Sequence, residues 1–145
     1  MKPLLLMLIA APLFAEFHTI TIRYTPSGCI ECAQSLEARL RKTRGVEELA
    51  FDPNGVVTLR LAANNRVRIE LIRDFIEQGG EKIQRIEVEA TGAIERDGGA
   101  DTFVLSGTET RYPVTGAKAA AARVRIAAHT DKSRPLAFTI DKTSE

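Results

Sequence analysis

The chain has few of the residue types that most metal or redox sites use. Its 145 residues include no Trp, two Cys, two His and two Met, and both methionines lie near the N-terminus. Beyond them, the soft donors are the sulfurs of Cys29 and Cys32, and the imidazoles are His18 and His129. A closed structural zinc site takes four ligands, so the two sulfurs do not complete one by themselves.

The chain also lacks an excess of either charge. It has 20 Lys and Arg against 19 Asp and Glu, and loss of Lys2 with the N-terminal segment would leave 19 against 19. A neutral total gives no reason to expect nucleic-acid binding. The sequence shows no Ser-His-Asp pattern, no phosphate loop and no pair of carboxylates with an evident task, so we do not expect an enzyme.

The one long apolar run lies within residues 1–15, MKPLLLMLIAAPLFA. An early Lys2, an apolar stretch and a small residue at Ala15 are typical of a secretory signal peptide. The run is short for a bilayer span, which needs about 20 residues. We expect cleavage after Ala15 and a periplasmic or secreted protein with no membrane insertion; an uncleaved anchor is the alternative.

Periodicity predicts alternating strands and helices in residues 16–90. Leu36 and Leu40 lie on one apolar stripe of a helix that Gly45 ends. Asn64 and Asn65 are expected to cap a second helix. The expected elements are a strand at 19–24, a helix at 29–43, a strand at 46–51, a strand at 56–62, a helix ending at 79–80 and a strand at 82–90.

Residues 91–145 contain glycines between four short strand-like runs, TFVLSG, ETRYPV, ARVRIAA and PLAFTI. They predict a small antiparallel β module, a partial barrel that loosely resembles an OB-type barrel in element order. The fold class predicted for the whole chain is α+β. It has a ferredoxin-like βαββαβ module at 16–90 followed by the small antiparallel β module at 91–145.

Both cysteines lie in the stretch TPSGCIECAQSLEARL, where a loop runs into the first helix. The Cys-x-x-Cys at that point of the βαββαβ order, and the phrase CAQSLEARLRKTRGV that follows, resemble the heavy-metal-associated (HMA) domain family. That family includes copper chaperones, the periplasmic mercury-binding protein and modules of metal-transporting ATPases. The resemblance covers about half of the chain. Ser27 stands where the family usually has a Met that packs beneath the loop.

The resemblance implies that Cys29 and Cys32 bind a soft metal ion. Thiolates select Cu(I), Hg(II) or Zn(II); two sulfurs in a linear geometry suit Cu(I) and Hg(II), and Cu(I) is the favoured ion. A metal donor or acceptor protein is the implied partner. It would dock on the basic residues that end the first helix, although a solvated helix end is the simpler interpretation. These residues are Arg39, Arg41, Lys42 and Arg44.

Two other interpretations of the cysteines stay open. Cys-x-x-Cys is also the motif of thiol–disulfide exchange, which suits an oxidising compartment, although the Trp and the Gly-Pro pair of thioredoxin-type sites are missing. The pair could equally be an inert disulfide, which stabilises little because the loop that it closes is short. Between them, Glu31 is either a third, hard ligand or a solvated residue at a helix start.

Overall fold

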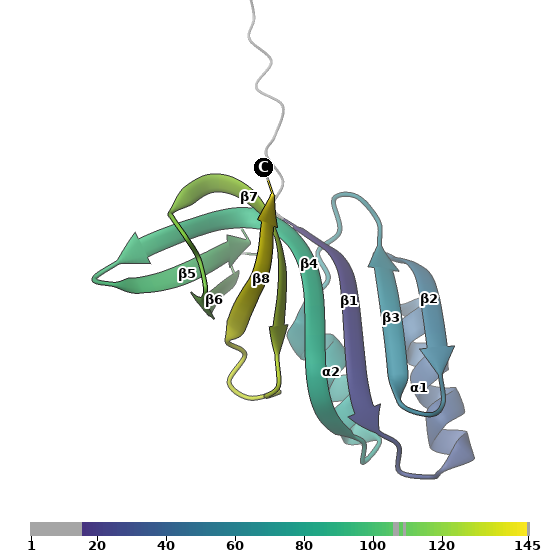
Figure 1. Cartoon of the computed structure of the whole chain (residues 1–145). Coiled ribbons are helices and arrows are strands. Elements are labelled where there is room, and N and C mark those ends of the chain that lie inside the picture. The colour runs from purple at the N-terminus through teal and green to yellow at the C-terminus, as the bar shows by residue number, and fades with distance from the viewer. Residues whose placement is uncertain (1–15, 106–107, 109, 145) are drawn as a thin grey trace, which may run out of the picture.

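The computed structural model describes residues 16–105, 108 and 110–144, so the expected signal peptide at 1–15 lies outside the described residues. Figure 1 shows the arrangement of the elements in this part of the chain. They are β1 (Glu16–Thr25), α1 (Ile30–Lys42), β2 (Val46–Asp52), β3 (Val56–Leu61), α2 (Ile69–Gln78), β4 (Lys82–Asp97), β5 (Ala100–Leu105), β6 (Thr110–Thr115), β7 (Ala121–Thr130) and β8 (Phe138–Ser144).

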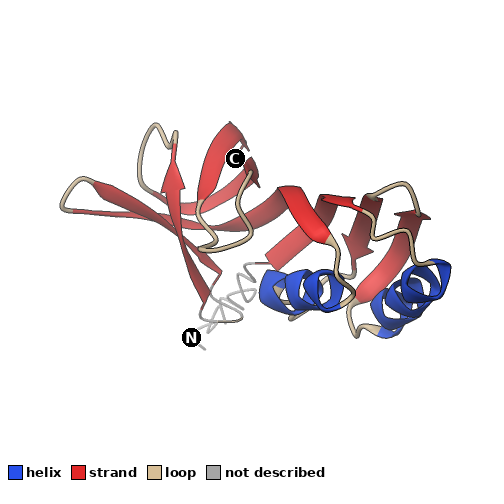
Figure 2. Cartoon of the chain, turned by 90° about the horizontal axis from the view of Figure 1, so that it is seen from below, coloured by secondary structure: helices blue, strands red, loops and turns tan. Residues whose placement is uncertain are grey.

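Both helices cover the same face of the sheet formed by β1 to β4 (Figure 2). α1 buries Leu36 and Leu40, as its apolar stripe predicts, while α2 buries three isoleucines. The expected asparagine cap on α2 is wrong, because Arg68 is the N-cap residue and its side chain makes no capping bond. Asn65 instead donates to the carbonyls of Phe17 and Ala62. Within the described residues, neither helix is long and apolar enough to cross a membrane.

β4 is the strand that joins the two halves of the molecule. Along one edge it pairs first with β1, from Lys82 to Thr91, and then with β5, from Ala93 to Asp97. Along the other edge it pairs with β7. Gly92 lies where β1 gives way to β5, and the register with β7 shifts just after it. The predicted domain boundary between residues 90 and 91 therefore falls inside one continuous strand.

The strands beyond this junction close into a ring. β4 pairs with β5, β5 with β6, β6 with β8, β8 with β7, and β7 with β4. The β6–β8 pair is parallel and short, and the other four are antiparallel. Every strand of the ring thus has a partner on both sides, which removes the open edges that a small separate sheet would have.

The predicted fold class is wrong. All eight strands of the described chain belong to one mixed sheet with the order β2-β3-β1-β4-β5-β6-β8-β7. A ferredoxin-like module followed by a small, purely antiparallel module would need two separate sheets. In this chain β4 pairs with strands of both parts, so the strands form a single sheet. The sequence suggested a break because glycines separate short strand-like runs from Gly92 onward, whereas β4 continues through Gly92 to Asp97.

One hydrophobic core runs through both halves. Three aromatic side chains connect the two halves. The ring centroid of Phe17 in β1 lies 6.1 Å from that of Tyr112 in β6, which lies 5.5 Å from that of Phe138 in β8. The Tyr112 hydroxyl donates to Glu70 at the start of α2, 3.1 Å away. Burial and the neighbouring Glu70 carboxylate raise the pKa of Tyr112 well above its usual value, so the hydroxyl stays protonated and keeps donating.

Charged side chains fasten α2 to the loop between β7 and β8. Arg134 of that loop contacts Asp74 and Glu77, both at 2.9 Å, and Arg73 of α2 donates to the Ser133 carbonyl at 3.2 Å. Hydrogen bonds from Arg73 and Arg134 lower the pKa of Asp74. The helical layer and the ring are therefore joined by charge as well as by core packing.

Gly92 provides the first test of this architecture. A Cβ there would lie 2.5 Å from the Val104 carbonyl oxygen and 2.7 Å from the Phe103 ring, whereas a Cβ at Gly79 meets ordinary contacts from 3.5 Å. We expect Gly92→Ala to lower the free energy of unfolding by about 1–3 kcal/mol, because backbone and a packed ring must move. The matched control Gly79→Ala should change it by under about 1 kcal/mol in urea titrations. Equal stabilities would contradict the close packing at Gly92.

A second prediction concerns the folding stability of the protein at low pH. Since the folded-state pKa of Asp74 is lowered, its contribution is fully present above the unfolded pKa, near 3.8, and is lost as pH falls through the lower folded value. Asp74→Asn should therefore show a smaller loss of stability between about pH 5 and pH 2 than the parent protein. Asp97→Asn, at an exposed turn, is the control. Parallel stability–pH curves for Asp74→Asn and the parent would contradict the assignment.

Candidate functional site

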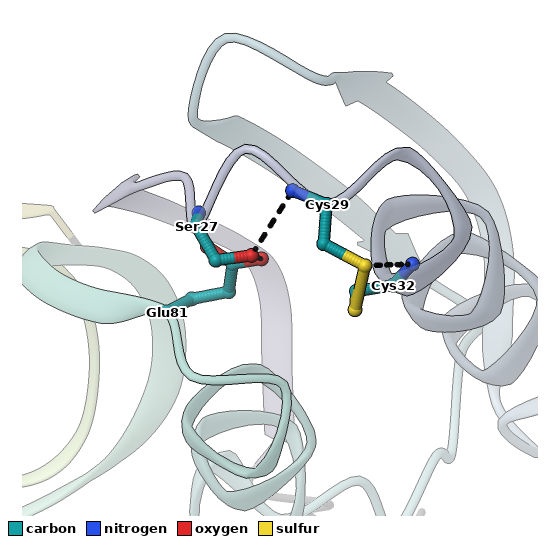
Figure 3. Close-up of a disulfide and its surroundings, with 4 residues drawn as sticks. All are labelled: Ser27, Cys29, Cys32 and Glu81. Atoms are coloured by element: carbon teal, nitrogen blue, oxygen red, sulfur yellow. Dashed lines mark hydrogen bonds between the residues drawn. A yellow bond between two sulfur atoms is a disulfide. The ribbon is translucent and has the colours of Figure 1, made fainter.

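The cysteines lie at the N-terminus of α1, after a loop that leaves β1. Gly28 has a φ of +81°, a conformation that suits glycine and turns the chain into the helix. Cys29 is the N-cap residue, and its Sγ accepts the Cys32 backbone N–H at 3.1 Å (Figure 3). The sulfur thus takes the place of the side-chain oxygen that usually caps a helix.

The two sulfurs form a disulfide between Cys29 and Cys32. Both cysteines are half-buried, and Ile30 between them leaves 75% of its surface in solvent. Glu31 is exposed as well. The sulfur pair is therefore within reach of a metal ion, a small thiol or a partner protein.

A buried carboxylate, Glu81, holds the loop that precedes the cysteines. Its oxygens accept the Ser27 backbone N–H at 2.5 Å and the Ser27 hydroxyl at 3.2 Å, and Ser27 Oγ in turn accepts the Cys29 N–H at 3.4 Å. Only 6% of the surface of Glu81 is exposed. Burial, Glu81 and Asp52 together raise the pKa of Tyr24 beneath this loop. Ser27, which stands where HMA domains usually have a Met, thus anchors the loop through polar contacts.

Sequence reasoning missed Glu81. It follows Gly79 and Gly80, where the pattern indicates only the end of a helix. The available signal is weak: one acidic residue directly before the alternating strand that begins at Lys82. Its partner Ser27 lies 54 residues away in the chain, and no local pattern connects the two.

A groove of about 500 Å³ opens beside the disulfide, between the start of α1 and the end of α2. Leu36 and Phe75 give it apolar walls. The Arg39 guanidinium lies 5.8 Å from the centre of the Phe75 ring and donates to Gln78 at 3.3 Å. The groove therefore offers a positive charge and an apolar surface close to the sulfurs.

The structure separates the basic residues that end α1. Arg39 lines the groove beside the cysteines. Arg41 pairs with Glu37 at 2.8 Å, and Lys42 is exposed. Arg44 lies past the helix end and lines a different pocket. Of the predicted docking residues, Arg39 alone lies at the groove with the sulfurs.

The two histidines lie away from the cysteines. His18 is near the start of β1, whose far end, Thr25, leads to the cysteine loop; its Nε2 is 2.7 Å from Thr91 Oγ1. Burial and Arg125 lower the pKa of His18. His129 of β7 contacts Asp141 at 2.8 Å. Within residues 16–105, 108 and 110–144, no group of three or more His, Cys, Asp or Glu is placed to hold a metal.

A scan of protein-family models finds no match to the chain, and neither curated proteins nor solved structures match it.

The Glu81 anchor leads to a prediction about the loop. Glu81→Ala would leave the Ser27 N–H without its acceptor, so we expect a loss of about 1–3 kcal/mol in the free energy of unfolding. The Ser27 amide should also exchange hydrogen faster. Glu31→Ala, at an exposed carboxylate in the first turn of α1, is the matched control and should change stability by under about 1 kcal/mol. Unchanged Ser27 exchange in Glu81→Ala would refute the anchor.

Proposed function

We propose that the reduced protein binds one soft metal ion through Cys29 and Cys32, with Cu(I) as the preferred ion and Hg(II) or Zn(II) as weaker candidates. The observation that carries the proposal is the placement of the two sulfurs together at the accessible N-terminus of α1. The resemblance of the sequence to HMA domains supports the same conclusion. The role would be capture, buffering or delivery of the metal outside the cytoplasm.

The chemistry of the sulfurs suits this task. Reduction of the disulfide by an external dithiol delivers two electrons and two protons and gives two thiols. Binding of one Cu(I) then releases the thiol protons, because the ligands are thiolates. The Cys32 N–H that points at the Cys29 sulfur, and the positive end of the α1 dipole, both favour a thiolate there.

A two-sulfur set also suits transfer. Cu(I) is stable with two thiolates, so the coordination shell can accept a third sulfur from a partner before one local cysteine leaves. Ser27 and Glu81 hold the loop on the side of β4, while Ile30 and Glu31 face solvent. A partner can therefore approach the metal from the solvent side without disturbing the anchor.

Thiol–disulfide exchange is the second candidate, and the disulfide between Cys29 and Cys32 favours it. In that reaction a thiolate of the reduced pair attacks a substrate disulfide and forms a mixed disulfide. The other cysteine then displaces the substrate, which leaves as a dithiol, and the local disulfide forms again. The groove beside the sulfurs would hold the substrate segment.

The deciding experiment is a competition titration of the reduced protein, without oxygen, with Cu(I), Hg(II) and Zn(II). We expect one equivalent of Cu(I) to bind tightly, and the Cys29→Ser/Cys32→Ser variant to lose at least about a thousandfold in affinity, since it lacks both thiolates. His129→Ala and Glu31→Gln are controls that keep both sulfurs and should bind Cu(I) as the parent does.

Two results would contradict metal binding. One is that none of the three ions binds in a cysteine-dependent way. The other is binding that persists in the double serine variant. In either case, a reduction potential for the pair between those of thioredoxin and the strong oxidant DsbA, roughly −270 to −120 mV, would favour the exchange reaction instead.

A further inference from the structure

A second pocket lies at the opposite end of the helical layer from the cysteines. It has a volume of about 600 Å³ and is lined by residues that follow α1, by the segment that connects β3 to α2, and by Leu71 in the first turns of α2. Its size is within the range of small-molecule sites. Three arginines line it: Arg44, Arg66 and Arg68.

Backbone packing brings these arginines together. Gly45 has a φ of +98°, and a Cβ there would lie 2.9 Å from Val67 Cγ2 and 3.0 Å from Asn65 Cβ. The Gly45 carbonyl also accepts the Ala62 N–H at 2.8 Å. The turn that contains Arg44 therefore packs closely against the segment that contains Arg66.

The segment before α2 turns its arginines outward. Val67 and Ile69 are buried, and the alternation of an extended chain leaves Arg66 and Arg68 exposed. The sequence NNRVRIE carries this alternation, so the signal was present but outweighed by the denser run of basic residues at the end of α1.

The charges of the three arginines are not neutralised in the described part of the chain. None of the three forms an ion pair there. Two carboxylates on flanking elements have contacts other than these arginines: Glu16 accepts the Asn64 N–H, and Glu70 accepts the Tyr112 hydroxyl with Oε1, while its Oε2 is buried without a hydrogen-bond partner. Three like charges on one pocket repel one another, and an anion that enters removes this repulsion.

We propose that this pocket binds the phosphate group of a small ligand. The planar guanidinium group of arginine can donate two parallel hydrogen bonds to two phosphate oxygens. Three such groups match the two negative charges and the several acceptor oxygens of a phosphate monoester. Leu71, 44% exposed at the pocket wall, offers an apolar surface for the rest of the ligand. The site is separate from Cys29 and Cys32 and does not depend on a metal.

The test is an NMR titration of the full-length protein, with inorganic phosphate in one arm and hexyl phosphate in another. We expect saturable shifts of the amides at residues 44–45 and 66–71, with hexyl phosphate binding severalfold more tightly because its chain contacts Leu71. The variant Arg44→Gln/Arg66→Gln/Arg68→Gln should bind at least about a hundredfold more weakly, since each charge-assisted contact contributes about tenfold.

The control is Arg23→Gln/Arg123→Gln/Lys142→Gln, which removes the same charge from exposed positions elsewhere. It should bind hexyl phosphate as the parent does. A third arm uses vesicles with and without phosphatidic acid, whose headgroup is a phosphate monoester. Cosedimentation that needs this lipid and the three pocket arginines, with no response to the soluble phosphates, would identify a lipid headgroup as the phosphate source. Equal weakening in both triple variants, or no binding in any arm, would overturn the proposal.

Discussion

The backbone of β4 hydrogen-bonds to three other strands, and the joining of the two halves of the molecule follows from that pairing. Its first ten residues, Lys82 to Thr91, align β1, and with β1 the whole helix-covered part of the sheet. Its last five align β5 and so begin the ring. β7 spans the junction on the opposite edge, from Ile86 to Ile94, so that neither part can rotate without breaking strand pairs. A residue without a side chain at position 92 lets β5 approach at this point.

The start of β4 also sets the geometry of the cysteines. Glu81 directly precedes the strand and places its carboxylate against Ser27, whose hydroxyl meets the Cys29 N–H. A displacement of β4 would therefore reach the first turn of α1 through three hydrogen bonds. Burial makes these bonds consequential, because the carboxylate has little water to replace a lost donor. The loop thus has a polar anchor at Ser27 and leads to an exposed residue, Ile30, at the start of α1.

Local patterns predicted the helices well, because the apolar stripe of α1 and the isoleucines of α2 repeat at helical spacing. They failed where contacts between segments far apart in the sequence determine the structure. The passage of β4 through Thr91 and Gly92 is supported by pairing with Arg125 and Val124 of β7, and the burial of Glu81 depends on Ser27. The basic run at the end of α1 is divided among different surfaces for a geometric reason. Successive helical residues are about 100° apart, so Arg39 and Arg41 point to different sides.

The two helices are antiparallel, since the start of α1 and the end of α2 line the groove at the cysteines, while the opposite ends line the arginine pocket. Each site therefore has one positive and one negative helix end beside it. At the cysteines, the Cys32 N–H of α1 donates to the Cys29 sulfur, and α2 ends there without a basic residue in its last turn, so Arg39 is the cation beside the groove. At the pocket, the negative end of α1 favours the arginines, and the positive end of α2 would favour a bound anion. The same helix pair thus places the cysteines at one end of the helical layer and the three arginines at the other.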